Sequence, residues 1–268
     1  MRGNPGDISH DSILLTRGEP TPRVYLLLHG LTASPRQFSE FGRLLFERGA
    51  TVSIPRLPRH GLTDRLTTEL EGLSVEELRD FARASTAYAQ TLGRRLTVVG
   101  FSVGGLLAAW IGQNIAVDRA TAVAPFLGPA WLPTGLIGRV ARATLLMPNR
   151  FLWWNPFSRE RQMPAHGYPR FPTHAVAQAI TLGQELLAQA GRSAPAAHDV
   201  QILVNASEAA ANNWAAQELA ALWSAHEGGR IVLHRLSGLP PSHDIIEPLR
   251  SPQIARSVYA ALLDLVER

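Results

Sequence analysis

The segment G-F-S-V-G at residues 100–104 constrains this chain more than any other stretch. An apolar, β-branched run precedes it at residues 96–99, and small apolar residues follow at 106–111. Glycines on both sides of a serine let a strand turn sharply into a helix, because glycine tolerates strained backbone angles and close packing. By chance, about 0.1 such matches are expected in a chain of this composition. The context therefore predicts a strand, a tight turn that exposes Ser102 above the sheet, and a helix.

Composition excludes several kinds of site. The 268 residues contain no cysteine, so disulfides, thiolate nucleophiles and cysteine-ligated zinc cannot occur. No H-E-x-x-H or similar spacing predicts another metal site, and we expect no cofactor. All 26 basic residues are arginine, and they are interleaved with 22 acidic residues, so the net charge is only +4. This pattern is typical of a solvated surface with ion pairs, and it argues against a nucleic-acid or anionic-membrane partner.

The sequence pattern also lacks membrane and export signals. Residues 1–9 are expected to form a loose tail, without the apolar segment of a signal peptide. Arg139 and Arg142 interrupt the longest apolar candidate at 132–147, so no run reaches the roughly 18 residues of a transmembrane helix. We therefore expect a soluble, cytoplasmic protein without stable membrane insertion. The sequence does not indicate an oligomeric state.

Apolar strand patterns and amphipathic helix patterns alternate along most of the chain. The candidate strands are residues 24–28, 51–54, 96–99, 120–124, 200–205 and 230–236, and the clearest helices are 75–92, 173–190, 213–226 and 252–266. This alternation predicts an α/β fold with a mostly parallel central sheet and helices on both faces. Residues 13–15 are expected to add an edge strand.

Two serines predict helix starts. Ser34 precedes Pro35, and proline is favoured at the first helical position. Ser74 and Glu77 have the spacing of a capping box, in which side chains and backbone N–H groups satisfy one another.

Residues 126–172 interrupt the alternation with aromatic residues, prolines and glycines. We expect a single domain whose core comprises residues 1–125 and 173–268, with 126–172 as a small cap insertion. Ligands bind at the carboxyl edge of such sheets, so Trp131, Trp153 and Trp154 are candidate pocket residues. Aromatic residues scattered through the core are the alternative interpretation.

A serine hydroxyl becomes a nucleophile beside a base that a third group orients. In one known chain order, the acid follows the serine and the histidine comes last. His243 fits this order, because it lies between the last predicted strand and the last predicted helix. The histidines at 10, 166, 174, 198 and 226 lack such a position and are expected to be structural or exposed.

Two carboxylates compete for the role of the acid. Glu208 is the only carboxylate in the loop after the strand 200–205, which is where the third group is expected. Asp244 is the alternative, although a residue adjacent to the base rarely points back at it. An oxyanion hole also needs two N–H donors, and the candidates are the backbone groups of Val103 and Leu31.

Four segments carry a resemblance to a known family. They are H-G-L-T-A-S-P at 29–35, R-L-P-R-H-G at 56–61, G-F-S-V-G-G at 100–105 and S-H-D at 242–244. Together they resemble the α/β-hydrolase superfamily, in particular its bacterial carboxylesterase and monoacylglycerol-lipase-like branch. The likeness extends over roughly residues 24–266.

The resemblance implies an α/β-hydrolase fold and an esterase with a small cap over its acyl pocket. Two residues depart from the pattern, since the family usually has glycine at the position of Arg59 and aspartate at that of Glu208. We expect a serine carboxylester hydrolase that takes small, uncharged esters with short-to-medium acyl or aryl groups. An acyltransferase or perhydrolase would use the same groups, and a non-catalytic ligand-binding protein on the same scaffold is an alternative of another class.

Overall fold

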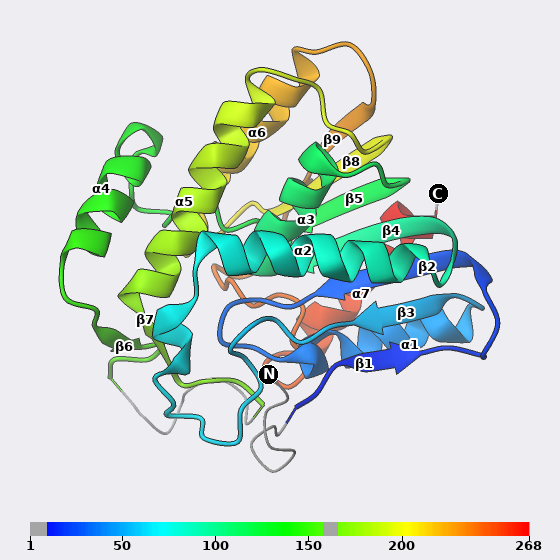
Figure 1. The fold of residues 1–268 in the computed structure, drawn as a ribbon, viewed down its shortest axis with the longest axis horizontal. Coiled ribbons are helices and arrows are strands. Elements are labelled where there is room, and N and C mark those ends of the chain that lie inside the picture. The colour runs from blue at the N-terminus through cyan, green and yellow to red at the C-terminus, as the bar shows by residue number, and fades with distance from the viewer. Residues whose placement is uncertain (1–9, 158–165, 268) are drawn as a thin grey trace.

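A seven-stranded sheet forms the centre of the computed structural model, which describes residues 10–157 and 166–267 (Figure 1). The strands are β1 (Ile13–Leu15), β2 (Thr21–Leu28), β3 (Thr51–Ile54), β4 (Gly93–Phe101), β5 (Arg119–Val123), β6 (Phe151–Trp153), β7 (Arg170–Pro172), β8 (Asp199–Asn205) and β9 (Arg230–Leu236). The helices are α1 (Ser39–Glu47), α2 (Val75–Gln90), α3 (Val103–Asn114), α4 (Thr134–Leu146), α5 (Thr173–Ala190), α6 (Asn213–Ser224) and α7 (Pro252–Glu267), with 3-10 turns η2 (Pro35–Phe38) and η3 (Glu69–Gly72). The tail expected at residues 1–9 lies outside the described residues.

The strand order confirms the predicted α/β architecture. It runs β1-β3-β2-β4-β5-β8-β9, and all neighbours are parallel except the edge strand β1, which pairs antiparallel with β3. The carboxyl ends of the parallel strands therefore meet at one edge of the sheet. The segments that carry Leu31, Ser102, Glu208 and His243 all leave from that edge.

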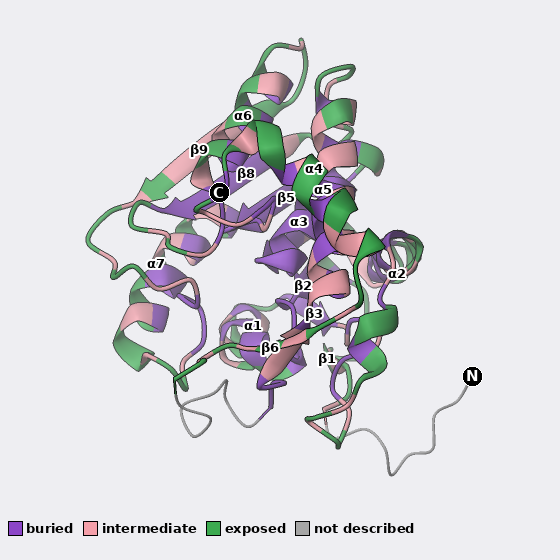
Figure 2. Cartoon of the chain, turned by 90° about the vertical axis from the view of Figure 1, so that its left-hand side faces the viewer, coloured by how far each residue is buried: buried purple, intermediate pink, exposed green. Residues whose placement is uncertain are grey.

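Helices cover both faces of the sheet (Figure 2). Along β2, Leu26 and Leu28 pack into the core beneath α2, α3, α5 and α6, while Tyr25 and Leu27 pack into the core beneath α1 and α7. Successive side chains of a strand point to opposite faces, so a strand buried on both faces reads as a continuous apolar run.

The two predicted helix starts differ in outcome. The capping box at Ser74 is confirmed, because its hydroxyl accepts the Glu77 N–H at 3.2 Å and the Glu77 carboxylate accepts the Ser74 N–H at 3.3 Å. The predicted start at Ser34 is confirmed in position, since Ser34 is the N-cap of η2 and Pro35 is its first residue. Ser34 precedes η2 but makes no side-chain cap, because its buried hydroxyl lies 3.1 Å from His166 Nδ1 instead.

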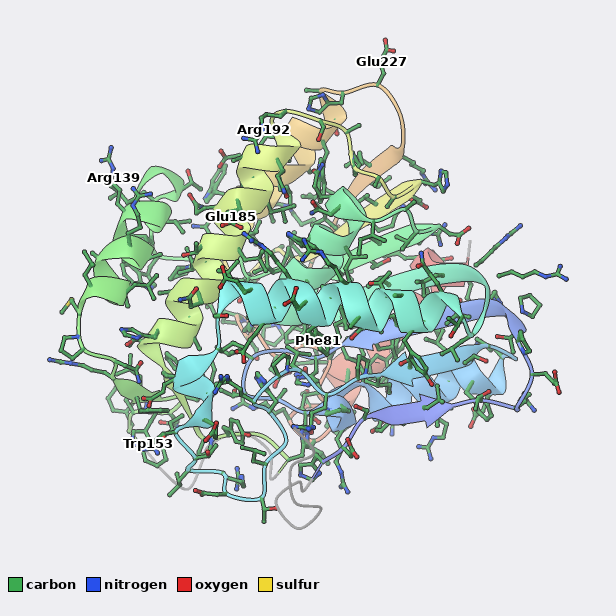
Figure 3. All side chains as sticks on the ribbon, in the orientation of Figure 1. Phe81, Arg139, Trp153, Glu185, Arg192 and Glu227 are labelled. Carbon is green, nitrogen blue, oxygen red and sulfur yellow. The ribbon has the colours of Figure 1, made fainter. Side chains whose placement is uncertain are left out.

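The described residues of the aromatic-rich segment 126–172 contribute no strand to the central sheet. Its strands β6 and β7 form a separate antiparallel pair. Helix α4 packs against α5, with the side chains of Ile137 and Ala141 buried. The outer side of α4 is exposed, and Figure 3 shows Arg139 pointing away from the body of the protein. Among the described residues, no helix combines the length and the apolarity needed to cross a membrane.

Candidate active site

Ser102 occupies a strained turn between β4 and α3. Its φ of 58° and ψ of −116° are uncommon for a residue with a side chain. A Cβ on Gly100 would lie 1.9 Å from the Gly104 carbonyl oxygen, and a Cβ on Gly104 would lie 1.9 Å from that of Leu28. The two glycines of the motif are therefore required by close backbone packing, as the sequence pattern predicts.

Three predicted side chains lie in one hydrogen-bonded row. Ser102 Oγ lies 2.8 Å from His243 Nε2, and His243 Nδ1 lies 3.0 Å from Glu208 Oε2. A carboxylate can only accept, so Nδ1–H donates to Glu208 and Nε2 is left to accept the serine proton. The arrangement can move a proton from the serine hydroxyl to the imidazole.

Glu208 is fixed within this row as an ionised acceptor. Its side chain is fully buried, and its second oxygen, Oε1, accepts the N–H groups of Ala210 and Ala211 at 2.8 and 3.3 Å. Burial raises the pKa of Glu208, but the hydrogen bond and charge of His243, with those two N–H groups, outweigh it and leave the pKa below its ordinary value. Glu208 therefore stays charged under neutral conditions.

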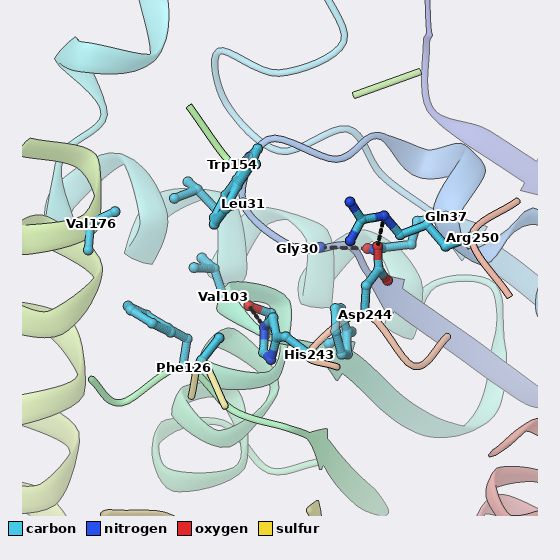
Figure 4. A pocket seen from close by; sticks show the side chains of 13 residues that line it. Gly30, Leu31, Gln37, Val103, Phe126, Trp154, Val176, His243, Asp244 and Arg250 are labelled. Carbon is cyan, nitrogen blue, oxygen red and sulfur yellow. Dashed lines mark hydrogen bonds and ion pairs between the residues drawn. The ribbon is translucent and has the colours of Figure 1, made fainter. Parts of the chain in front are cut away.

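Asp244, the other candidate acid, has different partners. Gln37 Nε2 donates to Asp244 Oδ1 at 3.4 Å, and Arg250 Nε lies 4.0 Å from Asp244 Oδ2 (Figure 4). Burial and the charge of Glu247 raise the pKa of Asp244 to about 6, against the opposing charge of Arg250. Of the two candidate acids, Glu208 is the one hydrogen-bonded to His243.

Asn205, which no sequence motif marks as a site residue, holds the loop that carries His243. It is the fully buried last residue of β8, and its Nδ2 donates to the carbonyl oxygens of Pro240 and Ser242 at 2.9 and 3.2 Å. An amide that ends an apolar strand at the carboxyl edge is the signal that could have drawn attention to it.

Leu31 and Val103 both line the pocket at Ser102. Val103 is the first residue of α3, where an N–H has no acceptor within the helix. Within residues 10–157 and 166–267, neither N–H donates a hydrogen bond to another protein group. Both donors are therefore open to a ligand oxygen.

The buried imidazole of His60 supports the loop that carries Leu31. Its Nε2 accepts the Thr32 N–H at 3.0 Å, so its Nδ1–H donates to the Pro58 carbonyl at 2.7 Å. Burial lowers the pKa of His60 to about 4, and burial also lowers the pKa of its neighbour His29 well below the ordinary value. Both imidazoles are therefore neutral near pH 7.

We predict that the protein loses stability as the pH falls from about 6.5 to 4. In this range unfolded histidine takes up a proton that folded His60 does not, so the free energy of unfolding falls, by up to about 3 kcal/mol for this residue. Urea unfolding between pH 7 and 4 measures the slope. His60→Gln should flatten it, whereas substitution of the exposed His198 by glutamine should leave it unchanged. An equal slope in the His60 variant would contradict the assignment.

The pocket at Ser102 has a volume of about 180 Å³ and two unlike ends. Apolar side chains line most of it, and polar ones line one end; the apolar group includes Leu31, Val103, Phe126, Trp154 and Val176, and the polar group Gln37, Asp244 and Arg250. In Figure 4, Phe126 and Val176 lie on one side of His243, and Gln37 and Arg250 lie on the other. An apolar group and a polar group can thus be held on opposite sides of the serine.

Of the three predicted pocket tryptophans, Trp154 alone lines this pocket among the described residues. Trp131 is 75% exposed and Trp153, which ends β6, is half-buried, and neither is among the residues that line the pocket. The pocket at Ser102 is thus lined by one of the three tryptophans, since an aromatic-rich composition does not indicate which side of a segment faces a ligand.

Arg59 adopts φ 64°, the left-handed region that glycine prefers. Its guanidinium lies 2.9 Å from Glu77 Oε2 and 3.3 Å from Glu69 Oε2. Arg59 therefore links its loop to α2 and η3, and it is not among the residues that line the pocket. In the part of the chain that the structure describes, no cluster of histidine and acidic side chains could hold a metal ion.

Comparisons with known proteins agree with this architecture. Among solved structures, the chain is similar to one described with two metagenome-derived lipolytic enzymes (18% identity, 95% of this chain and 96% of that chain, TM-score 0.66). It is also similar to the monoacylglycerol lipase of Paleococcus ferrophilus (17%, 94% and 98%, 0.65) and to a soluble variant of monoglyceride lipase from Saccharomyces cerevisiae (11%, 99% and 95%, 0.69). No curated protein sequence gives a significant match.

These similarities are all below 25% identity and therefore concern the fold. The family model described as "Alpha/beta hydrolase family" matches residues 25–247, which is most of the chain. The chain therefore belongs to the alpha/beta hydrolase family.

Proposed function

We propose that this protein is a serine carboxylester hydrolase that works through an acyl-enzyme. Ser102 is the nucleophile, His243 the base and Glu208 the acid that orients it. The observation that carries the proposal is the hydrogen-bonded row of these three side chains beside two open backbone donors. The lipolytic relatives support the same class of reaction.

The geometry suits acyl transfer in two steps. Ser102 Oγ attacks the ester carbonyl carbon as His243 Nε2 takes the hydroxyl proton, and the new oxyanion accepts the N–H groups of Leu31 and Val103. Each such donor is worth about 3 kcal/mol in the transition state. The intermediate then expels the alcohol, which takes the proton from His243. Water repeats the sequence on the acyl-enzyme, so the acid leaves and Ser102 is regenerated.

The size and lining of the pocket limit the substrate. A cavity of about 150 Å³ holds one benzene molecule, so the 180 Å³ here suits one aryl ring or a short acyl chain. At the polar end of the pocket, the positive charge of Arg250 and the negative charge of Asp244 offset each other. We propose small, uncharged esters as substrates, with residues 126–172 as the cap that contributes Trp154 to the acyl side.

We expect kcat/KM for p-nitrophenyl esters to peak at about four to eight acyl carbons. Each methylene buried is worth about 0.8 kcal/mol until the cavity is full, after which longer chains gain nothing and clash. The measurement is a series from acetate to palmitate, with a dicarboxylate half-ester as the charged comparison. A flat series, or a preference for the half-ester, would overturn the substrate proposal. Binding without any turnover would favour the ligand-binding alternative.

A further inference from the structure

Thr32 directly follows the oxyanion donor Leu31 and has an unusual backbone conformation. It is fully buried, and its φ is 64°. A β-branched residue rarely adopts this left-handed region, because its Cβ substituents crowd the backbone. Such a conformation persists only where the surrounding contacts hold it.

Four hydrogen bonds hold Thr32. Its N–H donates to His60 Nε2 at 3.0 Å, and its hydroxyl donates to the Leu31 carbonyl at 2.6 Å. The same hydroxyl accepts the indole N–H of Trp154 at 2.8 Å, and the Thr32 carbonyl accepts the Tyr168 N–H at 2.7 Å. Two of the four partners therefore come from the segment 126–172.

The peptide unit on the other side of Leu31 is fixed as well. The Gly30 carbonyl accepts the Ala33 N–H at 3.2 Å and the Nδ1–H of His29 at 2.9 Å. A peptide unit is planar, so fixing the Gly30 carbonyl also fixes the direction of the Leu31 N–H. Hydrogen bonds thus hold both peptide units that meet at the Leu31 Cα, the one that contains its N–H and the one that joins it to Thr32.

Trp154 connects this loop to the substrate space. Its ring lines the pocket, where Figure 4 shows it beside Leu31, and it packs at 4.3 Å between ring centroids against Phe171. The indole N–H meanwhile reaches Thr32. One side chain therefore contacts the space for the acyl group and anchors the loop that carries the oxyanion donor.

We propose that Thr32 and Trp154 are positioning residues, and that their hydrogen bond aims the Leu31 N–H at the oxyanion. Through this bond the insertion sets the geometry of the oxyanion hole as well as the shape of the pocket. The proposal rests on the proposed esterase function. The hydrogen bond between Thr32 and Trp154 is expected to act mainly in the transition state. Loss of this bond should therefore lower kcat more than it weakens substrate binding.

The test compares Trp154→Phe, Thr32→Val and the double variant with wild type on p-nitrophenyl butyrate. Trp154→Phe keeps an aromatic wall but loses the N–H, and we expect kcat to fall about tenfold with KM changed less than about twofold. A trifluoromethyl ketone forms a tetrahedral oxyanion adduct with the serine. This inhibitor should bind to Trp154→Phe more weakly than to the wild type by the same factor. Thr32→Ser keeps the hydroxyl and should retain most of the activity.

The double variant should be no slower than Thr32→Val, because both substitutions remove one shared hydrogen bond. Trp214→Phe, at a 72% exposed tryptophan of α6, is the matched control and should behave as wild type. An unchanged kcat in Trp154→Phe, multiplied effects in the double variant, or Thr32→Ser as slow as Thr32→Val would each overturn the inference. Absence of turnover by the wild-type protein would instead overturn the proposed function.

Discussion

Ser102→Ala is expected to lower kcat for p-nitrophenyl butyrate by about 10⁵- to 10⁶-fold, the size of effect seen when the nucleophile of a serine hydrolase is removed. The variant keeps the oxyanion donors and the pocket, so any residual rate over water comes from the oxyanion donors and from substrate binding. It also loses the proposed nucleophile, so a fluorophosphonate probe should no longer label the protein. Steady-state kinetics and intact-mass measurement of the labelled protein test both expectations.

The fold should tolerate this change. The hydroxyl of Ser102 contributes the bond to His243, while its backbone is held by the Val123 carbonyl at 3.0 Å and by the packing of Gly100 and Gly104. Thermal unfolding should therefore stay near that of the wild type. Ser257→Ala, at an exposed serine of α7, is the matched control and should retain both turnover and labelling. Near-normal activity in Ser102→Ala would remove the proposed nucleophile.

The parts of the site that could be predicted from the sequence are those carried by local patterns. A glycine-flanked serine between an apolar run and a small-residue helix specifies the turn at Ser102. His243 and Glu208 follow from chain order, because each lies in a loop at the carboxyl end of a parallel strand. The topology of a parallel sheet brings such loops together at one edge. Their proximity could therefore be predicted although they are far apart along the chain.

Contacts between loops could not be predicted in the same way. Thr32 is hydrogen-bonded to His60, Trp154 and Tyr168, which lie 28 to 136 positions away along the chain. Loops lack a hydrophobic periodicity, so their sequence does not indicate which residues they contact. Trp153 and Trp154 illustrate a second limit. Trp153 ends β6 and Trp154 follows it directly, yet only Trp154 is among the residues that line the pocket, and an aromatic-rich composition does not distinguish two adjacent tryptophans.

Glu208→Gln is expected to lower kcat by about 10³- to 10⁴-fold, although the two side chains have nearly the same shape. In the glutamine variant, the N–H groups of Ala210 and Ala211 still need an acceptor, so the amide oxygen takes the place of Oε1. The amide NH₂ then faces His243 Nδ1. Nδ1 becomes an acceptor, the proton moves to Nε2, and the imidazole can no longer take the proton of Ser102.

This tautomer argument separates Glu208 from Asp244 experimentally. Asp244→Asn should lose far less of kcat, because Asp244 is bonded to Gln37 and not to His243. Labelling of Glu208→Gln by a fluorophosphonate should be slow but detectable, since the serine and the oxyanion donors remain. The reverse order of the two variants in kcat/KM would transfer the orienting role to Asp244. A small effect of both would mean that neither carboxylate orients the base.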